Sequence, residues 1–403
     1  MLATAALLAL GAAPASADSI RNREYWLSEY SISQAWTTTK GAGVTIAIID
    51  TGVDGSHSDL TGAIVGGADF SGTGASNGQK PVGDSSDHGT MVASLAAGRG
   101  HGSGAGVIGA APEASILAIS IGFGDEAGDS DTQIAEAVRW AVDNGADIIN
   151  MSLTRNTLDW PESWDDAFLY AMEKDVVIIA AAGNRGSGTS VVGAPATMPG
   201  VLTVAGVDRN GSASFDASSQ GITIGVAAPS EELVGATPGN GYVLWDGTSG
   251  AAPIVAGVAA LVRAAHPELD AANVINRIVA TAKDAGATGV DPIYGYGRLD
   301  AAAAVTASVP TVTANPMGSL AEWITLYRRA ASTPAPAPPA AGAPAPQGTP
   351  ITADPGVTGT LLPSIAQLRD AGIPLLVYAG FAVTLVLLVA SAVRQRSGVR
   401  RRE

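Results

Sequence analysis

Short apolar runs alternate with segments of helical periodicity through the middle of the chain. Two segments, 131–145 and 161–175, space their apolar residues as amphipathic helices do. Around them, continuous runs rich in Val and Ile are typical of strands covered on both faces. These runs are VTIAIID (44–50), ILAISI (116–121), DIINMSL (147–153) and VVIIAAAGN (176–184), with later runs at 201–207 and 222–228. The alternation predicts an α/β domain over 44–307, with a mostly parallel central sheet between two layers of helices.

Polar residues stand at the ends of these predicted strands, where parallel sheets bind their ligands. Asp50 ends the first run, Ser152 follows DIINM, and Asn184 ends the fourth run. His88 opens HGTMVASLAAG, which we interpret as a helix whose first turn carries the imidazole. Plainer interpretations stay open at this point, with Asp50 as a strand-end cap and Asn184 as a turn residue.

The stretch GTSGAAPIVAG (247–257) also has two interpretations. Its small residues suit a buried, capped helix, whereas Ser249 suits a nucleophile at the helix start. A serine hydroxyl is a poor nucleophile until a histidine takes its proton and a carboxylate orients that histidine. The chain supplies Asp50, His88 and Ser249 in that order, and Ala251 stands where the elbow of α/β-hydrolases has its last glycine. Packing therefore explains the small residues, and catalysis explains Ser249.

Composition removes several classes of chemistry. The chain has no cysteine among its 403 residues, which excludes disulfides, thiolate metal sites and a cysteine nucleophile. With 37 acidic and 22 basic residues, its formal net charge is −15. Such acidity argues against a nucleic-acid partner. Serine, histidine and carboxylate groups are left as the candidates.

Both ends of the chain resemble targeting segments. Residues 1–17 place an apolar core before small residues, as in a signal peptide cleaved before Asp18. The usual charged start is missing, so a buried N-terminal helix is the alternative. Residues 373–393 are uncharged and long enough to cross about 30 Å of hydrocarbon as a transmembrane helix. The arginines of 394–403 favour a cytoplasmic tail, so we expect a single-pass cell-membrane protein whose domain is extracellular.

Two segments connect the predicted domain to these ends. Residues 18–43 form an N-terminal extension, and residues 308–372 form a linker to the membrane. Within the linker, 331–350 is rich in Pro and Ala and lacks the apolar content of a core. We expect an extended spacer that reaches on the order of 60 Å if it is fully polyproline-like.

The candidate residues lie in four blocks that resemble the signatures of the subtilisin-like (S8) serine proteases. The blocks are DTGV with HSDL behind it, HGTMVAS, AAAGN and GTSGAAPIVAG, spread over roughly residues 40–306. The resemblance implies a subtilisin-like fold, with Asp50 as orienting carboxylate, His88 as general base and acid, and Ser249 as nucleophile. It also implies that the Asn184 side chain donates to the oxyanion. The start of a helix at Ser249 would add a backbone N–H and the positive end of the dipole.

The same resemblance suggests how a substrate binds. Ser152 and Leu153 would pair with an extended peptide as an added strand. Gly183, just before the oxyanion asparagine, would line the pocket beside the scissile bond. The expected partners are therefore protein or peptide substrates.

Three features depart from the family pattern. Gly250 stands where the family has Met, which we expect to loosen the packing near the nucleophile. In place of the calcium-binding loop of many relatives, the chain has GRGHGSGAGVIG (98–109), leaving only Asp59 as a plausible ligand. We therefore expect no cofactor, with calcium only if Asp59 still serves. The extension 18–43 is too short for the folding pro-domain of the family.

These observations lead to two functional hypotheses. The first is a membrane-anchored extracellular serine endopeptidase that hydrolyses peptide bonds through an acyl-enzyme. The second follows from the short extension, the proline-rich spacer and the C-terminal apolar segment, which resemble the mycosins of type VII secretion systems. In that case the chain would process or scaffold components of a secretion complex, although mycosins commonly carry cysteines and this chain has none.

Overall fold

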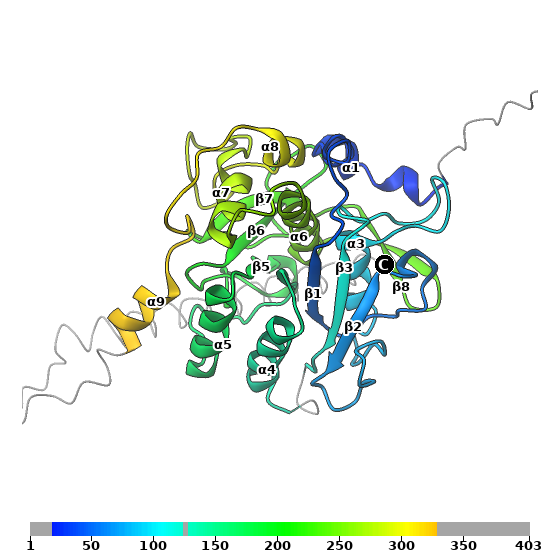
Figure 1. The fold of residues 1–403 in the computed structure, drawn as a ribbon, viewed down its shortest axis with the longest axis horizontal. Helices are drawn as coiled ribbons and strands as arrows, with labels where there is room; N and C mark the ends of the chain where they lie inside the picture. Colours follow the sequence, from blue (N-terminus) through cyan, green and yellow to red (C-terminus); the bar gives the residue numbers. More distant parts are fainter. Residues whose placement is uncertain (1–17, 124–127, 329–403) are drawn as a thin grey trace, which may run out of the picture. The chain divides into compact units, whose positions relative to one another are not determined.

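Seven parallel strands form the centre of the domain, in the order β2-β3-β1-β4-β5-β6-β7 (Figure 1). The computed structural model describes residues 18–123 and 128–328, which all belong to one compact unit. The strands are β1 (Thr45–Asp50), β2 (Ile64–Asp69), β3 (Ser115–Ser120), β4 (Ile148–Met151), β5 (Val177–Ala181), β6 (Leu202–Val207) and β7 (Ile224–Pro229). All six runs predicted as strands are confirmed. The β2 strand was not predicted, because two glycines interrupt its apolar pattern.

Helices cover both faces of this sheet, which confirms the three-layer α/β fold. On one face lie α4 (Ser130–Asp143) and α5 (Glu162–Glu173), the two helices predicted from apolar spacing (Figure 1). On the other lie α6 (Thr248–Ala265), α7 (Ala271–Ala280) and α8 (Ala301–Thr306). The helix that begins with the predicted base, α3 (His88–Ala97), packs against α6.

Helix α6 runs through the interior because its residues are small. A Cβ atom at Gly257 would lie 2.6 Å from the Cβ of Ala110 and 2.8 Å from the carbonyl oxygen of Ala96. Only glycine permits this approach. Among the described residues, α6 is the one helix long and apolar enough to cross a membrane, but most of it is buried in the domain, as in a core helix.

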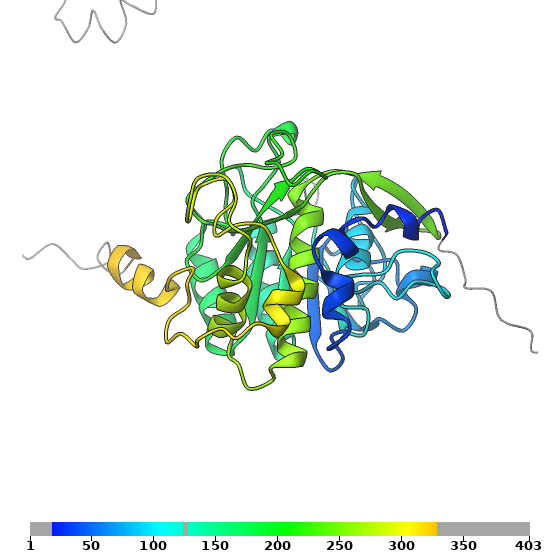
Figure 2. The same ribbon diagram turned by 90° about the horizontal axis from the view of Figure 1, so that it is seen from above.

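The N-terminal extension is folded onto the domain. Its helices α1 (Trp26–Glu29) and α2 (Ile32–Ala35) lie beside α8 (Figures 1 and 2). The side chains of Trp26 and Ile32 are fully buried. The extension therefore contributes apolar side chains to the core of the domain.

An antiparallel hairpin leads into the central helix. It consists of β8 (Leu233–Thr237) and β9 (Gly241–Trp245), and only two residues separate it from α6. Helix α3 packs against β8. The hairpin thus connects the element that carries His88 with the one that carries Ser249.

The chain beyond α8 stays on the domain for some distance. Helix α9 (Leu320–Trp323) buries Leu320, and Arg328 forms an ion pair with Asp165 of α5 at 2.8 Å. The predicted linker therefore contacts the domain through Leu320 and Arg328, while most other side chains of 308–328 are exposed or half-buried. The predicted signal peptide (1–17), spacer (331–350), transmembrane helix (373–393) and tail (394–403) lie outside the described residues.

Candidate active site

The topology brings the predicted residues to one edge of the sheet. Asp50 is the last residue of β1, and β1 lies beside β4, which leads to Ser152. Because Ile48 pairs with Asn150, Asp50 and Ser152 are level across the two strands. This edge is the carboxyl end of the strands, next to the point where the chain order of the sheet changes direction.

Asp50 and His88 form a direct hydrogen bond. The Nδ1 of His88 lies 2.8 Å from the Oδ1 of Asp50. The backbone N–H of Thr51 donates to the same oxygen at 2.8 Å. An Nδ1–H that donates to the carboxylate leaves Nε2 with a free lone pair, as a general base requires.

Burial and charge act in opposite directions on this histidine. Desolvation lowers the pKa of His88, but the negative charge of Asp50, its hydrogen bond and the charge of Asp87 outweigh that effect. The pKa of His88 therefore stands above the usual 6.5. Stabilising the imidazolium in this way is what proton transfer from a serine needs.

Ser249 is held against Ser152 from both sides. Its hydroxyl donates to the Ser152 carbonyl oxygen at 3.2 Å, while the Ser152 hydroxyl donates to the Ser249 carbonyl oxygen at 2.8 Å. Among the described residues, no hydrogen bond joins the Ser249 hydroxyl to His88. Catalytic hydrogen bonds are often missing or long without substrate and tighten in the complex.

The hydroxyl of Ser152 replaces a bond that α6 cannot form. Pro253 has no N–H, so the carbonyl of Ser249, four residues earlier, has no donor within the helix. Ser152 fills that position, and the side-chain amide of Asn150 donates to its hydroxyl at 3.0 Å. A buried chain of polar groups thereby fixes the backbone of Ser249.

Asn184 is fixed through its amide oxygen, and its amide nitrogen has no partner in the described part of the chain. Its Oδ1 accepts from both the backbone N–H and the hydroxyl of Thr248, each at 2.8 Å. Those two donors identify the oxygen, so Nδ2 remains as the donor. Gly247 lies against this amide: its φ is 145°, and a Cβ there would be 2.8 Å from the Nδ2 of Asn184. The geometry places an N–H donor beside the first turn of α6.

Two of the predicted substrate-binding residues, Gly183 and Leu153, lie in different surroundings. Gly183 adopts a φ of 97°, its N–H donates to the Thr248 hydroxyl, and its carbonyl accepts from the N–H of Ser219. Its backbone groups are therefore committed within the protein. Leu153 lies beside a cavity of about 390 Å³. The side chains around that cavity include Phe123, Asp131, Ile134, Thr154 and Arg155.

The expectation that Gly250 loosens the packing is wrong. A Cβ at Gly250 would lie 2.3 Å from the Cδ1 of Leu233 and 3.3 Å from the Cζ2 of Trp245. Side chains of the β8–β9 hairpin therefore fill the space that a larger residue would occupy. Trp245 also contacts the imidazole of His88, so the same indole lies against both helices of the site.

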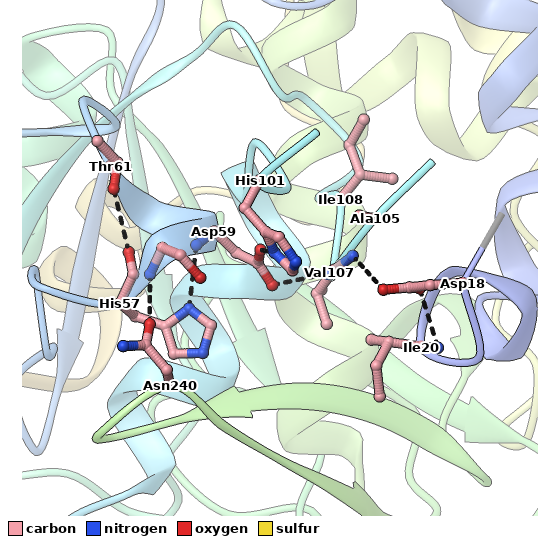
Figure 3. Close-up of polar contacts among 12 residues, drawn as sticks. Asp18, Ile20, His57, Asp59, Thr61, His101, Ala105, Val107, Ile108 and Asn240 are labelled. Atoms are coloured by element: carbon pink, nitrogen blue, oxygen red, sulfur yellow. Dashed lines mark hydrogen bonds and ion pairs between the residues drawn. The ribbon is translucent and has the colours of Figure 1, made fainter. Parts of the chain in front are cut away.

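Asp59 does not fit a calcium ion. It is fully buried, and donors of the protein surround its carboxylate (Figure 3). Oδ1 lies 2.5 Å from the Nδ1 of His101, and Oδ2 accepts from the Val107 N–H at 2.7 Å and the Tyr242 hydroxyl at 2.9 Å. Calcium takes six to eight oxygen ligands, whereas this carboxylate faces an imidazole and an N–H. The part of the chain that the structure describes contains no cluster of three or more potential metal-binding side chains.

The N-terminal extension supports the same loop. Asp18 accepts from the N–H of Gly106 at 3.0 Å and from its own neighbour Ile20 (Figure 3). Arg21 donates to the carbonyl oxygens of Ala105 and Gly106. Protein groups thus hold loop 98–109, where the family resemblance suggested a calcium site.

Three residues of the site were missed from the sequence. Asn150 carried a usable signal, because a polar side chain inside an apolar strand needs a partner. Thr248 and Trp245 carried none, since their partners Asn184 and His88 are distant in the chain. Only the fold shows these contacts.

Comparison with known proteins shows the family of the chain. A model of the subtilase family (peptidase S8) matches residues 41–297. The chain belongs to the subtilase family. Subtilisin DY of Bacillus licheniformis is 38% identical over 272 residues, which cover 66% of this chain and 92% of that protein. The protein is accordingly a serine endopeptidase.

Solved structures of subtilases show the same fold. MycP1 from Mycobacterium smegmatis superimposes with a TM-score of 0.61 at 32% identity, covering 73% of this chain and 86% of its own. The MycP3 protease from the type VII (ESX-3) secretion system has a TM-score of 0.61 at 30% identity, covering 74% and 90%. Both similarities support the resemblance to mycosins.

Proposed function

We propose that this subtilase cleaves peptide bonds through an acyl-enzyme formed on Ser249. The hydrogen bond between Asp50 and His88 carries the proposal, because it leaves the Nε2 of His88 as a base at the same sheet edge as Ser249. His88 takes the proton of the serine as the hydroxyl attacks the carbonyl carbon. It then donates that proton to the leaving amine, and later activates the water that releases the acyl group.

The oxyanion of each tetrahedral intermediate needs donors that are fixed in advance. The Nδ2 of Asn184 is one, since Thr248 fixes the amide. The N–H of Ser249 is the other, because N–H groups in the first turn of a helix have no acceptor within it. A fluorophosphonate probe, which reacts with activated serines, tests the proposal on the intact chain, and we expect it to label the protein.

Replacing Asn184 tests the oxyanion assignment. We expect Asn184→Ala to lower kcat by about 10²–10³-fold with KM little changed, because the lost donor acts mainly in the transition state. The measurement is steady-state hydrolysis of a fluorogenic peptide by the full chain. Asn184→Asp is the matched control: it can still accept from Thr248 but has no N–H, so its kcat should be equally low. An Asn184→Asp enzyme with normal kcat would refute the assignment.

We infer that calcium plays no part at Asp59. EDTA should change neither the rate of hydrolysis nor the melting temperature, since protein donors already satisfy the carboxylate. Replacing His101 by Ala should lower the melting temperature, because a buried carboxylate loses a hydrogen-bonding partner. A melting temperature that falls with EDTA and returns with added calcium would show that a metal binds after all.

A role in a secretion complex is the second candidate function. The MycP3 structure comes from a type VII secretion system, and its similarity covers 74% of this chain. The N-terminal extension, which folds onto the domain, and the apolar segment 373–393 also support this role. Under this proposal, that segment holds the chain in the membrane as a single-pass anchor, with the domain outside and the basic tail inside. In such a complex the chain would process secreted proteins, act as a scaffold, or do both.

A further inference from the structure

Trp245 lies between the candidate base and the candidate nucleophile. It is the last residue of β9, four positions before Ser249. Its ring meets the imidazole of His88 edge to face, with centroids 5.7 Å apart and planes at 77°. That geometry is favourable for aromatic pairs.

Two glycines make the space that the indole occupies. A Cβ at Gly235 would lie 2.9 Å from the Nε1 of Trp245, and a Cβ at Gly250 would lie 3.3 Å from its Cζ2. Leu233, which pairs with Trp245 in the hairpin, closes the space beside Gly250. The indole is therefore confined by backbone on two sides and by the imidazole on a third.

The packing of the indole must compensate for an unsatisfied polar group in its own ring. The Nε1 of Trp245 is buried, and no hydrogen-bond acceptor is present for it among the described residues. A buried N–H without an acceptor opposes folding, so the remaining contacts of the ring must stabilise this arrangement. A tryptophan at such a position points to a role for the shape of its ring.

The imidazole needs a second point of contact. Its hydrogen bond to Asp50 fixes Nδ1 but leaves the ring free to tilt about that atom. Proton transfer requires Nε2 to point at the serine hydroxyl, and small misplacements reduce the rate strongly. The edge-to-face contact with Trp245 restricts that tilt.

We propose that Trp245 is a positioning residue that holds the imidazole of His88 in the plane required for proton transfer from Ser249. This inference rests on the proposed function of the site. It also explains why a glycine occupies position 250. The indole of Trp245 and the side chain of Leu233 fill the space that a larger side chain would need.

The test compares two substitutions in the full chain. Trp245→Ala removes the ring, and we expect kcat to fall on the order of 10- to 100-fold while KM changes little. Trp245→Phe keeps an aromatic ring beside the imidazole and should restore most of kcat. A merely structural role would instead lower the melting temperature of both variants without this difference in kcat.

The pH profile gives a second readout. Charged groups facing His88 are Asp50 and Asp87, and both remain in Trp245→Ala. Burial lowers the pKa of His88, so exposing the ring to water should raise it. The acid limb of kcat/KM is therefore expected to move to higher pH. A profile that stays in place in an enzyme of normal kcat would overturn the proposal.

Gly250→Met provides an independent test, because Gly250 is one of the two glycines that make room for the indole of Trp245. Its side chain would displace the indole and lower kcat, and adding Trp245→Ala should then have little further effect. Trp323→Ala is the matched control, since that tryptophan packs against Trp160 rather than the site. Its kcat should stay normal. If Ser249→Ala retained activity the proposed function would fail, whereas a normal kcat in Trp245→Ala alone would leave the function intact and refute only the positioning role.

Discussion

Ser249→Ala is expected to lower turnover by about 10⁶-fold, which is the effect of removing the serine from a triad of this order. The variant keeps the Ser249 backbone, whose carbonyl oxygen accepts from the Ser152 hydroxyl. The fold should therefore persist, with a melting temperature close to that of the wild type. Hydrolysis of a denatured protein by the purified full chain measures the loss.

Fluorophosphonate labelling supplies the matched control. Wild type should label, and Ser249→Ala should not. Ser152→Ala should still label, because that hydroxyl supports the Ser249 backbone and is not the predicted nucleophile. A label that persists in Ser249→Ala would assign the reactive hydroxyl to a different residue.

The same variant separates an enzymatic role from a scaffolding one. Both functions predict a folded Ser249→Ala chain, but only catalysis depends on the hydroxyl. If proteolysis is the function in the cell, Ser249→Ala introduced into a deletion strain should not restore the wild-type phenotype. Full complementation by that variant would make the protease fold a structural component of a complex.

The parallel sheet and its polar edge could be predicted from sequence. Continuous Val- and Ile-rich runs are typical of strands that are buried on both faces, and all six of them are strands of one sheet. Because the carboxyl ends of parallel strands lie together, the sequence alone places Asp50 and Ser152 at one edge. The resemblance to subtilisin-like proteases implied the pairing of Asp50 with His88, and the two side chains lie within hydrogen-bond distance.

What could not be predicted depends on contacts between distant segments. Gly250 suggested loose packing, since the sequence does not show that Leu233 and Trp245 fold over it. Pro253 is the sixth residue of α6 and removes the donor for the Ser249 carbonyl. Ser152 repairs this from another strand. Such compensations leave no periodic pattern in the chain.

Asp50→Ala should have the second-largest effect, with kcat lower by about 10⁴-fold. The substitution removes both the acceptor that orients His88 and the charge that stabilises its imidazolium. The carboxylate also raises the pKa of His88, so the acid limb of the pH profile should move to lower pH. Pre-steady-state and steady-state hydrolysis across pH measure both effects, and an unmoved acid limb would contradict the assignment.

Asp50→Asn separates two roles of the carboxylate: orienting the imidazole of His88 and supplying a negative charge. The N–H of Thr51 donates to the same oxygen that His88 contacts, so the amide of asparagine should place its oxygen there. The tautomer of His88 is then preserved and only the negative charge is lost. We therefore expect Asp50→Asn to retain about tenfold more activity than Asp50→Ala, the value of one hydrogen bond to a charged group.

The stability of Asp50→Asn checks the same orientation of the amide. Its nitrogen would occupy the position of Oδ2 of Asp50, which is buried and has no partner among the described residues. That unsatisfied donor should reduce the free energy of unfolding by about 1–3 kcal/mol, measured by denaturant titration. Equal activities in Asp50→Asn and Asp50→Ala would mean that the amide turns its nitrogen toward His88 and that Thr51 does not control the tautomer.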